Sequence, residues 1–86
     1  MDDKFLLKLN GLIELDSENV PAYHERGLFY YYQQNYTQAL ADFDEAIKRV
    51  QDNAHYYYHR GLTYFYLEDY DKALEDFNAA VTLNPS

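Results

Sequence analysis

Residues 23–30 read Tyr-His-Glu-Arg-Gly-Leu-Phe-Tyr, and residues 57–64 read Tyr-Tyr-His-Arg-Gly-Leu-Thr-Tyr. The similarity extends beyond these stretches at a constant offset of 34, with 12 identities over the 33 aligned positions 20–52 and no gap. Composition alone does not produce this agreement, even in a chain with 11 tyrosines. The sequence therefore contains an internal repeat, and its two units can be interpreted together.

The composition indicates one small folded domain. The chain has 86 residues, 48% of them hydrophobic, and no cysteine, so disulfides and thiolate metal sites are excluded. The first eight residues lack the apolar core of a signal peptide, and no apolar run approaches the length of a membrane span. We expect a soluble, cytoplasmic protein without membrane contact.

The charge of the chain restricts its partners. The formal net charge is -8, and the seven lysines and arginines are scattered along the sequence. A nucleic-acid binder needs clustered basic residues to displace counterions from phosphates. We therefore expect a protein or peptide partner, basic or apolar in character, and no nucleic acid.

The spacing of apolar residues is helical throughout, which predicts an all-α fold. One helix is expected over residues 4–16. A second is capped by Asn19 and ends near Gln33, and a third and a fourth span residues 36–50 and 54–67. The fifth is capped by Asp69 and ends before Pro85.

The repeat resembles the tetratricopeptide repeat, a 34-residue helix-turn-helix unit, over residues 20–86. The resemblance implies a right-handed solenoid of five antiparallel helices in a single domain, 1–86. Residues 20–53 and 54–86 are the two units, and residues 4–16 are the second helix of a preceding one. The motif residues are Tyr23, Gly27, Tyr30, Ala39, Phe43 and Ala46, then Tyr57, Gly61, Tyr64, Ala73, Phe77, Ala80 and Pro85.

Two kinds of contact are expected inside the units. The glycines and alanines of the motif permit close approach of the helices, while the aromatic residues fill the remaining space. Arg26 and Arg60 lie at the edge of the core, where a guanidinium needs a partner. Asp42 and Asp76 follow 16 residues later in each unit, about where the second helix returns, so we predict the ion pairs Arg26–Asp42 and Arg60–Asp76.

The first helix of each unit has a second apolar face, roughly opposite the core face on a helical wheel. In the resembled family this face lines a concave groove where a peptide docks, and aromatic side chains suit that use. An alternative is that the same residues pack on the N-terminal helix, on a second copy or on further repeats. The candidate groove residues are His24, Leu28, Tyr31, Tyr32, Tyr58, Leu62, Phe65 and Tyr66.

No arrangement of catalytic residues or phosphate-binding loop is found, so neither catalysis nor a cofactor is expected. His55 and His59 have a spacing that could hold a metal ion, but without further ligands we expect them to be solvated. The leading prediction is a non-enzymatic scaffold that binds a peptide or protein segment. The alternative is a structural or self-association module, a homo-oligomer through the last helix or a fragment of a longer array.

Overall fold

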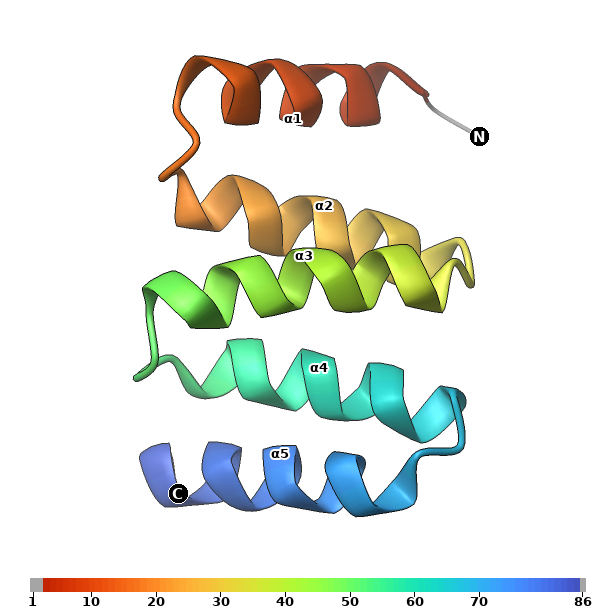
Figure 1. The fold of residues 1–86 in the computed structure, drawn as a ribbon, viewed down its shortest axis with the longest axis vertical. Coiled ribbons are helices and arrows are strands. Elements are labelled where there is room, and N and C mark those ends of the chain that lie inside the picture. The colour runs from red at the N-terminus through yellow and green to blue at the C-terminus, as the bar shows by residue number, and fades with distance from the viewer. Residues whose placement is uncertain (1–2, 86) are drawn as a thin grey trace.

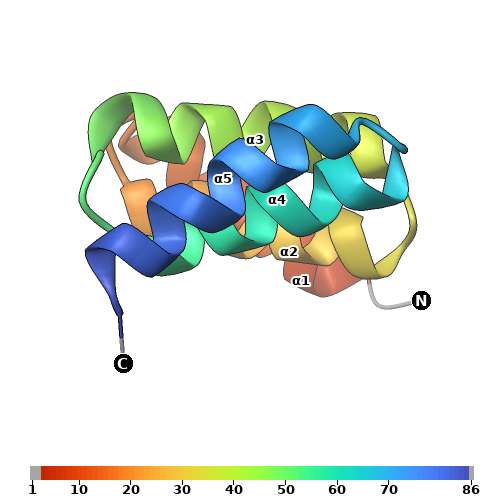
Figure 2. The same cartoon turned by 90° about the horizontal axis from the view of Figure 1, so that it is seen from below.

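The computed structural model describes residues 3–85, so Met1, Asp2 and Ser86 of the predicted domain lie outside the described part. The regular structure within that range is helical, which confirms the predicted all-α fold. The helices stack in chain order as antiparallel neighbours (Figure 1), and α5 runs obliquely across the helices behind it when the stack is seen from below (Figure 2). They are α1 (Asp3–Leu15), α2 (Val20–Tyr32), α3 (Tyr36–Arg49), α4 (Ala54–Tyr66) and α5 (Tyr70–Leu83).

Side-chain caps define where α2, α4 and α5 begin, and that of α4 is Asn53, which accepts a hydrogen bond from the backbone N–H of His55. The Asn19 side chain accepts a hydrogen bond from the backbone N–H of Ala22, and Asp69 accepts one from the backbone N–H of Lys72. Both residues were predicted as caps, and each satisfies a donor that the first turn of a helix leaves without an intrahelical partner.

The α2–α3 and α4–α5 turns share one backbone geometry. The N–H of Asn35 donates to the carbonyl of Tyr30 and the N–H of Gln34 to that of Tyr31, which is the Schellman arrangement. The second turn repeats these bonds 34 residues later. Both turns place a residue other than glycine, Gln34 or Glu68, at a φ of 64°. A side chain is unfavourable in this left-handed conformation.

Gln34→Gly and Glu68→Gly are each expected to raise the free energy of unfolding by about 0.5–1 kcal/mol, because relief of the left-handed strain exceeds the added entropy of the unfolded chain. Urea denaturation measures this change. The matched control is Gln33→Gly, because Gln33 has a φ of -82° and gains nothing from glycine. Destabilisation of Gln34→Gly equal to that of the control would contradict the explanation.

The predicted close approach of the helices is confirmed at both motif glycines. A Cβ atom added to Gly27 would lie 2.6 Å from the ring of Phe43, and one added to Gly61 would lie 2.8 Å from the ring of Phe77. Neither distance is compatible with a side chain unless the ring moves. The glycines therefore let the phenylalanine rings of α3 and α5 pack directly on the backbones of α2 and α4.

The predicted ion pairs are present, and each arginine has a second partner that was not predicted. Arg26 donates to both carboxylate oxygens of Asp42 at 2.8 and 2.7 Å, and its Nη1 donates to Asn10 on α1 at 2.8 Å. Arg60 makes the equivalent bonds to Asp76, and its Nη1 donates to Asp44 on α3 at 3.1 Å. Each guanidinium thus joins the two helices of its own unit to the helix before it.

The connections between units are held by a tyrosine hydroxyl. Tyr23 donates to the carbonyl of Ser17 and Tyr57 to that of Gln51, both at 3.0 Å. Gln51 stands where the second unit has Pro85. Its side-chain amide donates to the carbonyls of Ile47 and Lys48. It therefore satisfies acceptors at the end of α3 that would otherwise rely on water.

Candidate functional site

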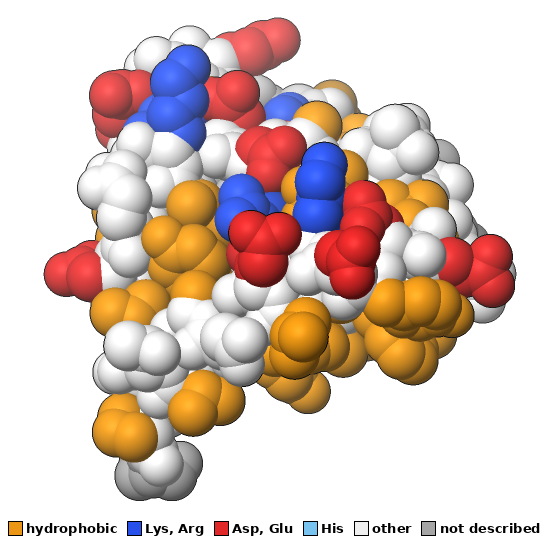
Figure 3. Space-filling view, turned by 60° about the horizontal axis from the view of Figure 1, so that its bottom comes forward, with side chains coloured by type: hydrophobic (Ala, Val, Ile, Leu, Met, Phe, Trp, Pro, Cys, Tyr) orange, Lys and Arg blue, Asp and Glu red, His pale blue; other side chains and the backbone are white. Residues whose placement is uncertain are grey.

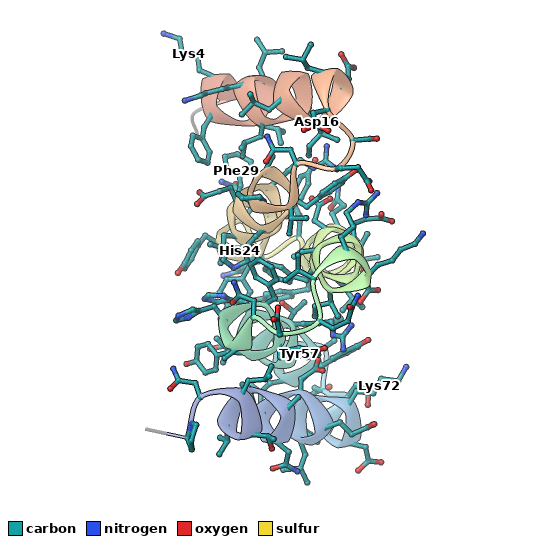
Figure 4. The ribbon with its side chains drawn as sticks, turned by 90° about the vertical axis from the view of Figure 1, so that its left-hand side faces the viewer. Lys4, Asp16, His24, Phe29, Tyr57 and Lys72 are labelled. Atoms are coloured by element: carbon teal, nitrogen blue, oxygen red, sulfur yellow. The ribbon has the colours of Figure 1, made fainter. Side chains whose placement is uncertain are left out.

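The candidate groove residues lie on α2 and α4, the first helices of the two units, and they differ in exposure. His24, Leu28, Tyr31 and Leu62 are partly buried. Figure 4 shows His24 on the side of α2 that faces α4. The outer members of the face are open to solvent: Tyr32 is 74% exposed, Tyr66 52%, Tyr58 47% and Phe65 46%.

Three tyrosine rings form a cluster near the α2–α3 turn. The rings of Tyr36 and Tyr66 are stacked, with centroids 5.5 Å apart and planes 7° from parallel. Tyr31 meets both rings edge-on at about 6 Å. Burial, followed by the neighbouring Tyr66, raises the pKa of Tyr31 from 10 to about 12, so its hydroxyl stays protonated even at strongly basic pH. Tyr36 belongs to α3 and was absent from the predicted set.

The exposed rings are supported by their aromatic neighbours. Tyr32 contacts Tyr31 edge-on at 5.2 Å, and Phe65 contacts both Tyr66 and Tyr70 edge-on at 5.4 and 5.6 Å. Edge-on contacts between aromatic rings are favourable beyond the area they bury. These rings are therefore oriented before any partner arrives, which lowers the entropy lost on binding.

A histidine pair lies where α2 meets α4. Nε2 of His24 and Nδ1 of His59 are 3.0 Å apart, and the His24 ring also contacts Tyr56 and Phe43. The prediction that both C-terminal histidines are solvated is therefore wrong for His59, which is partly buried, whereas His55 is exposed. His24 and His59 are 35 positions apart, one more than the 34-residue period. A side chain of the first unit therefore contacts the residue that lies one repeat position further along in the second unit.

The histidine pair is held in its neutral form. Burial, followed by the neighbouring His59 and His55, lowers the pKa of His24 from 6.5 to about 4, and burial also lowers the pKa of His59. A hydrogen bond between two imidazoles needs one donor and one acceptor nitrogen, which protonation of both rings would remove. The contribution of the neutral pair to the free energy of unfolding is therefore complete above the histidine pKa of the unfolded state. It is lost as the pH falls through the lower pKa of the folded state.

Acidification from pH 6.5 to 4 is expected to lower the free energy of unfolding through His24. The expected loss is about 1–2 kcal/mol, since partial exposure of the ring screens some of the effect. Urea denaturation across this range measures it. In His24→Leu the pH dependence should shrink. The control His55→Gln should keep most of it, because burial lowers the pKa of His24 more than His55 does. An unchanged pH dependence in His24→Leu would contradict the role of this pair.

A shallow depression of about 310 Å³ lies between α1 and α2. It is lined by Phe5, Leu9, Leu12 and Ala22 among others. Ala22 occupies the repeat position of Tyr56, whose ring is buried in the second unit. The depression is thus bordered by an alanine at a position where the next unit has a large ring.

The comparisons with known proteins agree with this geometry. The family model described as "Tetratricopeptide repeat" matches residues 24–86. The chain belongs to the tetratricopeptide repeat family. The solenoid, the motif glycines and the two-helix units confirm the predicted resemblance. This fold presents extended surfaces to protein partners, so its general role is that of a protein-interaction scaffold.

Among solved structures, this tetratricopeptide repeat chain is similar to YrrB, described as a TPR protein with an unusual peptide-binding site. The TM-score is 0.85 at 27% sequence identity, and the match covers 91% of this chain. The chain corresponds to 40% of the length of YrrB. No curated protein matched the sequence.

Two features are absent from the described part of this tetratricopeptide repeat chain. No helix there combines the length and the apolar character needed to cross a membrane. Over the same residues, no three or more histidine, cysteine or acidic side chains are grouped closely enough to hold a metal ion.

Proposed function

We propose that the chain is a non-enzymatic scaffold whose α2–α4 face binds a peptide or protein segment. The observation that carries this proposal is the exposure of Tyr32, Tyr58, Phe65 and Tyr66 on the first helices of the two units. Large apolar side chains at such density are unusual on a surface that contacts only water.

The proposed mechanism is docking on a preformed surface. Aromatic rings offer a large contact area for the loss of few rotamers, and tyrosine hydroxyls can exchange hydrogen bonds with the backbone of a partner. Because the rings already support one another, most of the ordering on binding falls on the partner. The similarity to YrrB, whose description names a peptide-binding site, is consistent with this mechanism.

The test begins with peptides selected against the wild-type protein from a random display library. Calorimetric titration then compares the wild type with Tyr58→Ala combined with Phe65→Ala. We expect affinity to fall at least about tenfold, because contacts in aromatic hot spots dominate such interfaces. The melting temperature should change little, since both rings are about half exposed.

The matched control is Leu74→Ala combined with Val81→Ala, which removes a similar exposed apolar area from α5. It should retain the affinity of the wild type. Equal affinities of the groove variant and the wild type for every selected peptide would refute the proposed groove.

A second candidate function, self-association, is favoured by the outer side of α5. Val81 is 61% exposed, whereas its repeat equivalent on α3, Ile47, is 8% exposed. Figure 3 brings the α5 end of the stack forward and shows hydrophobic side chains in several patches around a group of charged ones. Exposed apolar side chains on the last helix of a stack can be covered by a second copy of the chain.

Light scattering over a range of concentrations tests self-association. Under this second candidate the mass should rise with concentration in the wild type and in the groove variant, but not in Val81→Lys. A mass that stays monomeric throughout would exclude it. The two candidates are thus separated by different variants and by different measurements.

A further inference from the structure

Exposed aromatic residues gather where α2 and α4 end and α5 begins. We name this patch the aromatic end and define it by Tyr32, Phe65, Tyr66 and Tyr70, all of which are exposed. Ring contacts connect the patch to neighbouring helices. Tyr66 of α4 stacks on Tyr36 of α3, and Phe65 of α4 contacts Tyr70 of α5. The patch is therefore one surface built from both units.

The turn within the aromatic end is acidic. Glu68, Asp69 and Asp71 lie between or beside Tyr66 and Tyr70 in the sequence, while the α2–α3 turn at residues 33–37 carries no charged residue. Figure 4 shows Lys4 at the top of the stack and Lys72 on the side away from His24. Two exposed acidic residues, Glu68 and Asp71, thus lie within two positions of the exposed rings of Tyr66 and Tyr70.

The arginines of the chain are already engaged within the fold. Arg26 and Arg60 bind Asp42 and Asp76, and Arg49 binds Glu18 and Glu45. The net charge of -8 consequently leaves an excess of carboxylates on the surface. Complementary charge favours a basic partner and accelerates its encounter with the protein.

Tyrosine rings in this fold already accept cations. The guanidinium carbon of Arg49 lies 4.7 Å from the centroid of the Tyr23 ring, and the ammonium of Lys72 lies 5.6 Å from that of Tyr64. Arg60 also lies 5.7 Å from the Tyr57 ring. These contacts fall within the distance at which the negative face of an aromatic ring attracts a positive charge.

We infer that the aromatic end recognises a basic peptide segment, with arginine side chains placed over its exposed rings and held by Glu68 and Asp71. This inference rests on the proposed function, because it names the chemistry of the segment that the scaffold binds. Arginine suits the site better than lysine, since its planar guanidinium can stack on a ring and donate to a carboxylate at the same time.

Fluorescence polarisation with a labelled peptide of alternating arginine and glycine tests the inference. The reference peptide carries citrulline in place of arginine, which keeps the shape and removes the charge. We expect the citrulline peptide to bind at least about fivefold more weakly. Binding of the arginine peptide should weaken as salt is added.

Two variants locate the binding on the aromatic end. Tyr66→Leu keeps an apolar side chain but removes the ring, and Glu68→Gln with Asp71→Asn removes two charges. Each is expected to weaken binding of the arginine peptide by about fivefold. The matched control, Glu14→Gln with Asp52→Asn, makes the same charge change elsewhere and should stay within about twofold.

Tyr32→Leu provides a second ring variant for the case in which Tyr66→Leu unfolds, because the Tyr32 ring is the most exposed of the patch. Citrulline and arginine peptides of equal affinity would overturn the inference, as would a control that weakens binding as much as the aromatic-end variants. The inference can fail while peptides selected from the library still lose affinity for the Tyr58→Ala with Phe65→Ala variant. The proposed groove then stands, and only its preference for basic segments fails. If no selected peptide loses affinity for that variant, both proposals fail.

Discussion

Arg26→Leu is expected to lower the free energy of unfolding by about 3–5 kcal/mol. The reason is the carboxylate that the substitution leaves behind. The Asp42 side chain is only 5% exposed, and both of its oxygens accept hydrogen bonds from Arg26. Without the guanidinium, Asp42 would be a buried charge with no compensating partner, and Asn10 would lose its bond as well.

Urea denaturation of Arg26→Leu and of the double variant Arg26→Leu with Asp42→Leu distinguishes this explanation from a simple loss of contacts. The double variant should recover part of the stability, since neither charge remains in the interior. Glu18→Gln is the control, because it removes only an exposed partner of Arg49 and should change stability by less than about 1 kcal/mol. A double variant less stable than Arg26→Leu would argue against the pair.

Phe43→Ala is the second substitution with a large expected effect, a loss of about 3–5 kcal/mol. The Phe43 ring is fully buried, lies against the backbone of Gly27 and contacts both His24 and His59. Removing it leaves a cavity among three helices that cannot close without moving them. For a domain of this size, such a loss is a large part of the total stability.

Phe77→Ala is the matched comparison, since Phe77 occupies the same repeat position and lies against Gly61. Phe77 is only partly buried, because α5 has a neighbour among the described helices on one side alone. We expect its loss to be smaller than that of Phe43→Ala by at least about 1 kcal/mol. Equal losses in urea denaturation would show that burial does not distinguish the two units.

Much of the fold could be predicted because its signals are local or repeated. Asn19 and Asp69 act as caps through bonds to residues three positions away, so their roles are visible in short stretches of sequence. The pairing of Arg26 with Asp42 was predictable because the same two residue types recur 16 apart in the second unit. A repeat thus provides two observations of each contact.

Other features depend on contacts between units, which a single unit does not contain. The bond from Arg26 reaches an asparagine on α1, but the equivalent bond from Arg60 reaches an aspartate on α3, so no shared residue type marks it. His24 and His59 meet only because adjacent repeat positions of neighbouring units face each other. Prediction of the candidate groove from the sequence was limited in the same way. The spacing of its residues placed them on one side of each helix but did not show which rings are exposed.

The repeat of residues 20–52 at residues 54–86, which includes the doubled stretch at 23–30 and 57–64, by itself determined the helical units, their 34-residue period and the residues that hold each unit together. It did so because helix formation, capping and glycine packing are satisfied within one unit. Only the tertiary structure decided the environment of the second apolar face. There the packing of α2 against α4 partly buries His24 beside His59 and leaves Tyr32 and Tyr66 exposed to solvent, because burial depends on what the neighbouring unit places opposite each side chain.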